Sequence, residues 1–221
     1  SHPAQETQAG WEGRKEYGED CLNLNIYVPA RAALEARREG RGLPVLVYIH
    51  GGAFLGGMGS AQLFEGWGFA SRGVVLVTIN YRLGIFGYMA HPQLSAENEK
   101  GVSGNYGLLD QIAALRWIKE NIAAFGGDPN RITVAGQSAG GMSVCALLTS
   151  PLSAGLFRAA AIHSGGPSYN RMMPEMQKVE AFGERAMRIC GCTTLSQMRE
   201  ISAEELLDVD INCDERIPFQ P

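Results

Sequence analysis

The chain has 221 residues, a formal net charge of −4 at neutral pH, and 45% hydrophobic against 19% charged residues. This length allows one domain with a sizeable core, or one domain and a piece of another. The apolar and charged fractions are typical of a globular protein, and the small negative charge gives no reason to expect a nucleic acid partner. Because no apolar run approaches the length of a membrane-spanning helix, we expect no membrane partner either.

Along the first half of the chain, apolar runs alternate with polar or glycine-rich stretches. Residues 22–28 alternate apolar and polar side chains, which is typical of a strand. Residues 45–49 and 74–79 are continuous apolar runs, as expected of parallel strands that are buried on both faces. Between the strands predicted at 22–28 and 45–49, residues 30–42 carry four arginines among alanines and glycines. We interpret them as a solvated excursion rather than as a patch that binds an anionic ligand.

The clearest helix is predicted over residues 107–125. Apolar side chains recur there at steps of three or four, and a glycine pair followed by a proline stops the pattern. Residues 131–135 and 157–162 are predicted as two further strands. Strands that alternate with helices indicate parallel βαβ units with right-handed crossovers, and therefore a doubly wound α/β sheet.

The last quarter of the chain has a different pattern, that of amphipathic helices. We assign residues 167–221 to a helical segment of the same domain. An apolar stripe at helical spacing runs over residues 176–189. Two capping boxes are expected to open shorter helices, namely Thr194 with Gln197 and Ser202 with Glu205.

Residues 136–140, Gly-Gln-Ser-Ala-Gly, have the form G-x-S-x-G. An apolar, β-branched run precedes them and a segment that can form a helix follows, which is the context of a nucleophile elbow. So sharp a turn brings strand and helix backbones together, and side chains at Gly136 and Gly140 would collide. Ser138 is then pushed to the tip of the turn, above the helix N-terminus. The alternative is an ordinary glycine-rich turn whose serine caps the helix.

A second glycine-rich loop supports the elbow. Residues 50–54, His-Gly-Gly-Ala-Phe, directly follow the strand predicted at 45–49. In this architecture an oxyanion hole needs one backbone N–H after the nucleophile and others from a loop after an earlier strand. The two motifs stand in that order along the chain, so together they favour a nucleophile elbow over an ordinary turn.

With these two motifs and four further blocks, the chain resembles the type B carboxylesterase and cholinesterase family of α/β-hydrolases. The further blocks are residues 19–27 (EDCLNLNIY), 80–84 (NYRLG), 104–111 (GNYGLLDQ) and 125–129 (FGGDP). The resemblance implies an α/β-hydrolase fold, with a mostly parallel doubly wound sheet and flanking helices. Residues 1–221 would then be the N-terminal and central part of one catalytic domain.

The resemblance also implies hydrolysis of a small-molecule carboxylic ester through an acyl-serine intermediate. It assigns Ser138 as the nucleophile, and the backbone N–H groups of Gly52, Ala53 and Ala139 as the oxyanion hole. Gln137 stands where the family commonly has glutamate, so a negative charge beside the nucleophile is absent and cationic substrates would be attracted less. No metal or organic cofactor is expected, because the sequence has neither a phosphate-binding loop nor zinc-ligand spacing.

No histidine of this chain is a convincing general base. In this fold the triad order is Ser, then Asp or Glu, then His. His163 is the only histidine after Ser138, and no acidic residue lies between them. We interpret His163 as structural, and we expect His50 to shape the oxyanion loop by hydrogen bonding. Since the family domain is more than twice this length, the chain is expected to be one piece of a longer or nicked esterase. The rest of the domain, or less simply a second polypeptide, would supply acid and base.

Other functions remain open at this point. Some family members keep the fold as adhesion or binding proteins without catalysis, although these typically lose the nucleophile or the oxyanion residues. An inactive fragment, an amidase or a thioesterase could carry the same elbow. An odd number of cysteines, five, without a disulfide framework favours the reducing cytoplasm of a bacterium, with secretion left open.

Overall fold

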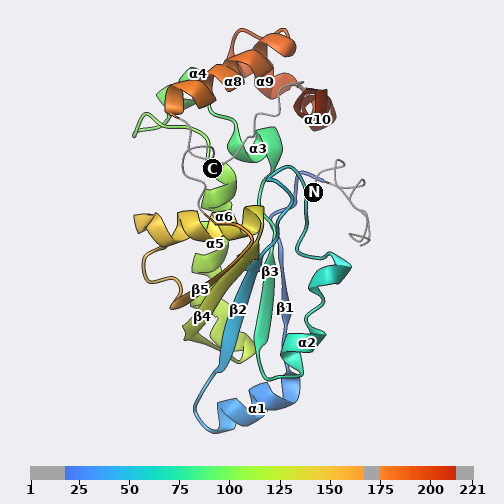
Figure 1. Cartoon of the computed structure of the whole chain (residues 1–221), viewed down its shortest axis with the longest axis vertical. Helices are drawn as coiled ribbons and strands as arrows, with labels where there is room; N and C mark the ends of the chain where they lie inside the picture. Colours follow the sequence, from blue (N-terminus) through green and yellow to red (C-terminus); the bar gives the residue numbers. More distant parts are fainter. Residues whose placement is uncertain (1–17, 167–174, 213–221) are drawn as a thin grey trace.

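The computed structural model describes residues 18–166 and 175–212 (Figure 1). Its centre is a five-stranded sheet with the strand order β1-β3-β2-β4-β5. Strands β2 to β5 run parallel, and β1 pairs antiparallel with β3 at one edge. The strands are β1 (Leu24–Tyr27), β2 (Leu43–Ile49), β3 (Val75–Ile79), β4 (Gly127–Gln137) and β5 (Ala159–His163). The predicted α/β fold with a mostly parallel sheet is confirmed.

The burial of each strand follows its place in the sheet. Every residue of β3 is buried, and β2 alternates between buried and half-buried positions. β5 forms the other edge and is more exposed, with Ile162 at 41%. β4 begins at Gly127, four residues before the predicted start, because Gly127 pairs with Leu43 ahead of a shift in register. Pro129 is tolerated there because proline fits a strand only where the ladder is irregular or at an edge.

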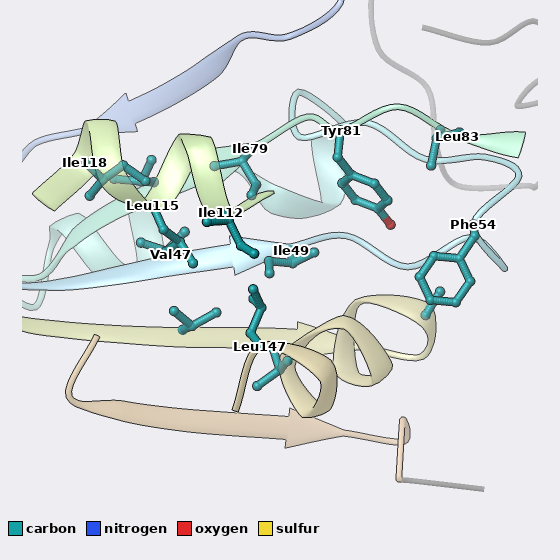
Figure 2. Packing of buried hydrophobic residues seen from close by; sticks show 14 of the residues in the cluster. Val47, Ile49, Phe54, Ile79, Tyr81, Leu83, Ile112, Leu115, Ile118 and Leu147 are labelled. Carbon is teal, nitrogen blue, oxygen red and sulfur yellow. The ribbon is translucent and has the colours of Figure 1, made fainter. Parts of the chain in front are cut away.

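Helices α5 (Tyr106–Asn121) and α6 (Ala139–Thr149) pack against the sheet and against each other. Ile112, Leu115 and Ile118 of α5 lie near Val47 of β2 (Figure 2). A 3₁₀ turn, η3 (Ile122–Phe125), extends α5, and Gly126 ends it with a φ of 83°. The helix predicted over 107–125 is therefore confirmed.

The arginine-rich stretch after β1 departs in part from expectation. It is an excursion between strands, but it contains a helix, α1 (Ala30–Arg38). Ala33 and Ala36 are buried against the core, while the Arg31 side chain is 94% exposed and pairs with Glu35 one turn away. Small residues spaced by three give this helix its buried face, which the arginines obscure in the sequence.

The remaining helices connect the strands or form a group of their own. They are η2 (Gln62–Phe64), α2 (Trp67–Ala70), α3 (Gly84–Tyr88), α4 (Pro92–Glu97), η4 (Pro151–Ser153), α8 (Met176–Ile189), α9 (Leu195–Glu200) and α10 (Ala203–Asn212). Helices α8, α9 and α10 lie together at one end of the molecule, beside α3 and α4 and away from the sheet (Figure 1). Both predicted capping boxes are present, with side chain and backbone bonded reciprocally. No helix in the described ranges is both long and apolar enough to cross a membrane.

Candidate active site

Ser138 occupies the turn between β4 and α6 with a backbone that L-residues rarely adopt, φ 55° and ψ −123°. Such a conformation costs about 1–3 kcal/mol and persists only where neighbouring structure holds it. Two backbone bonds hold it here. The Ser138 N–H donates to His163 O (2.9 Å), and Ser138 O accepts from Met142 N–H (3.0 Å). The serine is thus displayed at the end of β4, half-exposed, at the start of α6.

The two motif glycines are required by close backbone contact. A Cβ atom at Gly136 would lie 2.3 Å from Gly140 O, and one at Gly140 would lie 2.1 Å from Ile49 O. Neither position can hold a side chain unless the backbone moves. The collision expected from the sequence is confirmed, and it places the N-terminus of α6 directly against the end of β2.

The loop after β2 lies beside Ser138. β2 and β4 are parallel neighbours, so their carboxyl ends meet at one edge of the sheet. A Cβ at Gly51 would lie 3.2 Å from Ser138 Cβ, which shows how closely the loop approaches the serine. The next three residues, Gly52, Ala53 and Phe54, all have positive φ, of 121°, 55° and 60°. This succession folds the loop back tightly on itself next to the elbow.

Three backbone N–H groups near Ser138 have no hydrogen-bond acceptor within residues 18–166 and 175–212. They belong to Gly52, Ala53 and Ala139, the residues that the sequence nominated. Of these residues Ala139 is buried, Gly52 is half-buried and Ala53 is exposed. Backbone donors without a protein partner beside a displayed serine are candidates for binding a ligand oxygen, above all where the donor is buried. Ala139 is 1% exposed.

Each of these three N–H groups belongs to a peptide unit whose carbonyl, on the preceding residue, accepts a hydrogen bond. In a trans peptide the N–H and C=O point in opposite directions, so fixing the carbonyl also fixes the direction of the N–H. None of the peptide bonds described is cis. The bonds are His50 Nδ1 to Gly51 O (2.8 Å), Leu55 N and Gly56 N to Gly52 O (3.0 and 2.9 Å), and Met142 N to Ser138 O (3.0 Å).

His50 is a neutral, buried member of this loop. Its side chain is 1% exposed, and burial lowers its pKa to about 4, so it is uncharged at neutral pH. Because Gly51 O can only accept, the proton is on Nδ1, and Nε2 has no partner in the described structure. The ring stacks on Tyr81 with centroids 4.5 Å apart. His50 therefore shapes the loop, as expected, and does not face Ser138 as a base.

His163 is not placed as a base either. Its backbone oxygen accepts from the Ser138 N–H, but its side chain is exposed at the end of β5. Within the described part of the chain, no side chain is hydrogen-bonded to the Ser138 hydroxyl. Gln137 is exposed beside the serine, and no three His, Cys, Asp or Glu side chains among the described residues are grouped to hold a metal ion.

Two sequence blocks that carried no assigned role turn out to support the site. Arg82 follows β3, and its guanidinium makes two hydrogen bonds to Asp110 of α5, at 2.8 and 2.9 Å. Asp110 also accepts the Arg82 backbone N–H (3.0 Å), and its side chain is 8% exposed. This hydrogen bonding raises the pKa of Arg82. Sequence reasoning missed the pair because nothing in the spacing of two opposite charges tells a partly buried pair from two solvated ones.

Comparison with known proteins agrees with this geometry. The sequence profile described as "Carboxylesterase family" matches residues 2–221. The chain belongs to the carboxylesterase family. It is 48% identical over 174 residues to the fumonisin B1 esterase of Sphingopyxis macrogoltabida, covering 78% of this chain and 31% of that protein. It is 45% identical over 192 residues to the para-nitrobenzyl esterase of Bacillus subtilis (strain 168), covering 86% and 36%.

A solved carboxylesterase of Geobacillus stearothermophilus superposes with a TM-score of 0.82 at 44% identity, covering 92% of this chain and 41% of that one. The chain spans about a third of the length of the two curated relatives named above. Similar carboxylesterases also come from mammals, for example the human cocaine esterase at 49% identity over 148 residues, or 66% of this chain and 24% of that protein. The relatives thus include bacterial and eukaryotic proteins, and the cytoplasmic location stays a prediction. In the described residues Cys21, Cys145 and Cys192 are free thiols, and Cys213 lies outside them.

Proposed function

We propose that this chain supplies the nucleophile and the oxyanion hole of a serine carboxylesterase. The observation that carries the proposal is the set of three unpaired, oriented N–H groups of Gly52, Ala53 and Ala139 beside Ser138. A ring of backbone donors next to a displayed serine suits a reaction in which negative charge develops on an oxygen, as in acyl transfer.

The reaction proceeds in two halves. The Ser138 Oγ attacks the carbonyl carbon of the ester while a base takes its proton, and the carbonyl oxygen becomes an oxyanion held by the three N–H groups. Collapse of this intermediate expels the alcohol and leaves an acyl group on Ser138. Water then attacks the acyl carbon, the carboxylic acid leaves, and the serine regains its proton. The acid and the base are assigned to the remainder of the catalytic domain, outside this chain.

The start of α6 adds to this stabilisation. Ala139 is the first residue of that helix, so its N–H lies at the positive end of the helix dipole. Donors that are already oriented need no rearrangement when charge develops, and each contributes roughly 10²–10³-fold to kcat in serine hydrolases. The strain at Ser138 is the structural cost of presenting the hydroxyl at this point.

The proposed substrates are small-molecule carboxylic esters without a positive charge next to the scissile bond. The names of two relatives, a fumonisin B1 esterase and a para-nitrobenzyl esterase, give ester hydrolysis as their activity. At the nucleophile of this chain, Gln137 is exposed and uncharged, so it offers no carboxylate to a cationic substrate.

The test is covalent labelling of the full-length protein that contains this chain. Intact mass is measured before and after a fluorophosphonate ester, and the modified peptide is sequenced. We expect one adduct, on Ser138, and none on Ser138→Ala. Ser71→Ala, a surface serine at the end of α2, serves as the matched control and keeps the adduct. A folded protein that takes no label at Ser138 would instead be a non-catalytic binding protein or an inactive fragment.

A substrate panel distinguishes the remaining chemistries. Matched carboxylic ester, thioester and anilide substrates with the same acyl group are compared by kcat/KM. The proposal expects the ester to be hydrolysed best. A preference for the thioester or the anilide would keep the acyl-serine mechanism and replace the carboxylesterase assignment by a thioesterase or an amidase.

A further inference from the structure

The segment that follows β3, residues 80–84, is bonded to the loop after β2 at three separate points. The three contacts fall at the beginning, the middle and the end of that loop, so the segment fixes its whole course. Tyr81 lies beyond the end of β2, with Phe54 further along the same edge (Figure 2). The contacts are Tyr81 OH donating to His50 O (2.8 Å), Gly84 N–H donating to Phe54 O (2.7 Å) and Gly59 N–H donating to Asn80 Oδ1 (2.7 Å).

Tyr81 holds His50 in two ways. Its hydroxyl donates to the His50 carbonyl, and its ring stacks on the imidazole at 4.5 Å with 21° between the planes. Tyr81 is 2% exposed, and Gly57 closes the Nδ1–Cε1 edge of the imidazole, since a Cβ there would lie 2.1 Å from Nδ1 and 2.7 Å from Cε1. The imidazole therefore cannot turn without displacing the tyrosine or the loop.

The orientation of the imidazole decides the orientation of an oxyanion donor. His50 Nδ1 donates to Gly51 O, and that carbonyl belongs to the same peptide unit as the Gly52 N–H. Tyr81 thus controls the Gly52 N–H through His50 without touching Ser138.

The segment itself is firmly anchored. Arg82 is bound on one side by Asp110, through both its side chain and its backbone N–H. On the other side its carbonyl is packed against glycines, since a Cβ at Gly87 or Gly107 would lie 2.2 or 2.4 Å from Arg82 O. Because residues 80–84 are fixed in this way, their contacts can also fix the loop after β2.

We propose that Tyr81 is a positioning residue for ester hydrolysis, which aligns the Gly52 N–H with the developing oxyanion by fixing His50. This inference rests on the proposed function. The N–H groups bind the charged oxygen of the transition state more strongly than the carbonyl of the bound ester. Loss of Tyr81 must therefore lower kcat and leave KM nearly unchanged, a split that general loss of stability does not produce once active sites are counted.

The experiment uses the full-length enzyme with Tyr81→Phe, which keeps the ring, and Tyr81→Leu, which removes ring and hydroxyl. Tyr48→Phe on β2 is the matched control, because the Tyr48 hydroxyl makes no hydrogen bond within the described ranges and its ring contacts Phe64. Active sites are titrated with a fluorophosphonate, and kcat per titrated serine and KM are measured on a para-nitrophenyl ester. Inhibition by a trifluoromethyl ketone, whose adduct with serine carries an oxyanion, is measured alongside.

For Tyr81→Phe we expect kcat per titrated serine to fall roughly fivefold, and for Tyr81→Leu roughly fiftyfold, less than the loss of a whole donor. KM stays within about twofold, and ketone affinity falls in parallel with kcat. Tyr48→Phe behaves as the unaltered enzyme. Should Tyr81→Leu not fold, Tyr81→Phe decides together with Asn80→Ala, which removes the acceptor of the Gly59 N–H and is expected to give the same split.

Unchanged kcat and ketone affinity in Tyr81→Phe and Tyr81→Leu would overturn the inference while leaving the proposed function intact. A rise in KM at constant kcat would also overturn it, because it would make Tyr81 a substrate contact. Absence of labelling in the unaltered enzyme is a different failure, since it removes the proposed function and this inference with it.

Discussion

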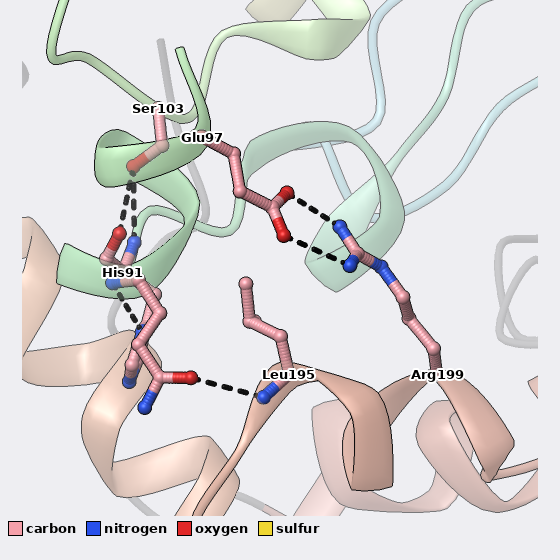
Figure 3. A network of polar contacts seen from close by, with 6 residues as sticks. His91, Glu97, Ser103, Leu195 and Arg199 are labelled. Atoms are coloured by element: carbon pink, nitrogen blue, oxygen red, sulfur yellow. Dashed lines mark hydrogen bonds and ion pairs between the residues drawn. The ribbon is translucent and has the colours of Figure 1, made fainter.

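The contacts around Ser138 are made mainly by the backbone, whereas the hydrogen bonds that fix α9 against α4 are made by side chains of α4 and α9. At the elbow, glycines allow strand, helix and loop backbones to touch, and carbonyls and N–H groups bond to each other. At the helical end, the Gln93 amide bonds the backbone of Thr193 and Leu195, both at 3.0 Å. Arg199 makes two bonds to Glu97, at 2.9 and 2.6 Å (Figure 3).

The two regions have different requirements: the elbow must place its donors precisely, whereas the helices only have to stay attached. An oxyanion hole works only if its donors are placed within a fraction of an ångström, and backbone contacts allow very little adjustment. Helices that only have to stay attached can use contacts on long, partly exposed side chains, which can be exchanged at little cost. Substitutions should therefore have large effects at the elbow and small ones at the exposed side chains that join α9 to α4.

The strongest test of this comparison is Gly140→Ala. In an ordinary helix this change stabilises by about 1 kcal/mol. Here the new methyl group would lie 2.1 Å from Ile49 O and 2.8 Å from His50 O, both backbone atoms. We expect destabilisation by roughly 4 kcal/mol or more and a loss of kcat/KM above about a hundredfold, measured by urea unfolding and ester hydrolysis.

Gly68→Ala in α2 is the matched control. An added Cβ there meets nothing within 4 Å in the described structure. We expect stability to rise by up to about 1 kcal/mol and hydrolysis to stay unchanged. If Gly140→Ala were as mild as Gly68→Ala, the backbone contact between α6 and β2 would not be the rigid constraint described above.

His50 gives the next largest effect, one that depends on pH. Burial lowers its pKa in the folded protein to about 4, against an ordinary value of 6.5. Between these values the unfolded chain binds a proton that the folded chain does not. Stability is therefore complete above pH 6.5 and is lost as the pH falls, by roughly 3 kcal/mol on reaching pH 4. Urea unfolding at pH 7, 5.5 and 4 measures it.

His50→Gln should remove this part of the pH dependence, although it lowers stability at pH 7. His163→Gln, a change on an exposed side chain at the end of β5, is the control and should keep the dependence of stability on pH that His50 causes. If the free energy of unfolding of His50→Gln falls with pH as steeply as that of the unaltered protein, another group is responsible and the His50 ring is not held neutral.

The elbow and the parallel strands could be predicted because local sequence decides them. Apolar runs specify buried strands, and the spacing of Gly136, Ser138 and Gly140 specifies a sharp turn between strand and helix. The antiparallel direction of β1 could not be predicted, since alternation along a strand carries no information about its neighbour. The role that we propose for Tyr81 was also beyond reach, because it depends on a hydrogen bond between residues 31 positions apart.

The residues proposed for the oxyanion hole illustrate the same limit inside the site. The order of the two glycine-rich motifs nominated Gly52, Ala53 and Ala139, and parallel pairing of β2 with β4 explains why they meet. That the His50 ring is placed to hold the Gly51 carbonyl depends on its packing against Tyr81, and no motif encodes it.

A smaller effect is expected from the strained backbone of Ser138. Alanine at this position keeps the strain of a φ of 55° and a ψ of −123°, while glycine relieves it. We expect Ser138→Gly to be about 1 kcal/mol more stable than Ser138→Ala, after the greater chain entropy of glycine is taken into account. Both variants should be inactive. Equal stability of the two would mean that the elbow stores no strain.

Arg199→Ala is expected to have the smallest effect. Both partners of the Arg199–Glu97 pair are more than half exposed, so solvent and salt weaken their attraction. The hydrogen bond from Arg199 lowers the pKa of Glu97. The contribution of the pair is therefore present above the ordinary glutamate pKa and disappears as the pH falls below it. We expect Tm at pH 7 to fall by about two degrees at most, and by less at pH 3.

Arg188→Ala, on the exposed side of α8, is the control for loss of one positive charge and should leave this pH dependence in place. A fall in Tm of many degrees in Arg199→Ala alone would contradict the comparison. It would mean that the ion pair, rather than the buried Ala186, Met187, Leu195 and Met198, holds the helices in place. A small fall in Tm would instead mean that these buried apolar side chains hold the helices in place, because a substitution at the exposed Arg199 leaves them in contact.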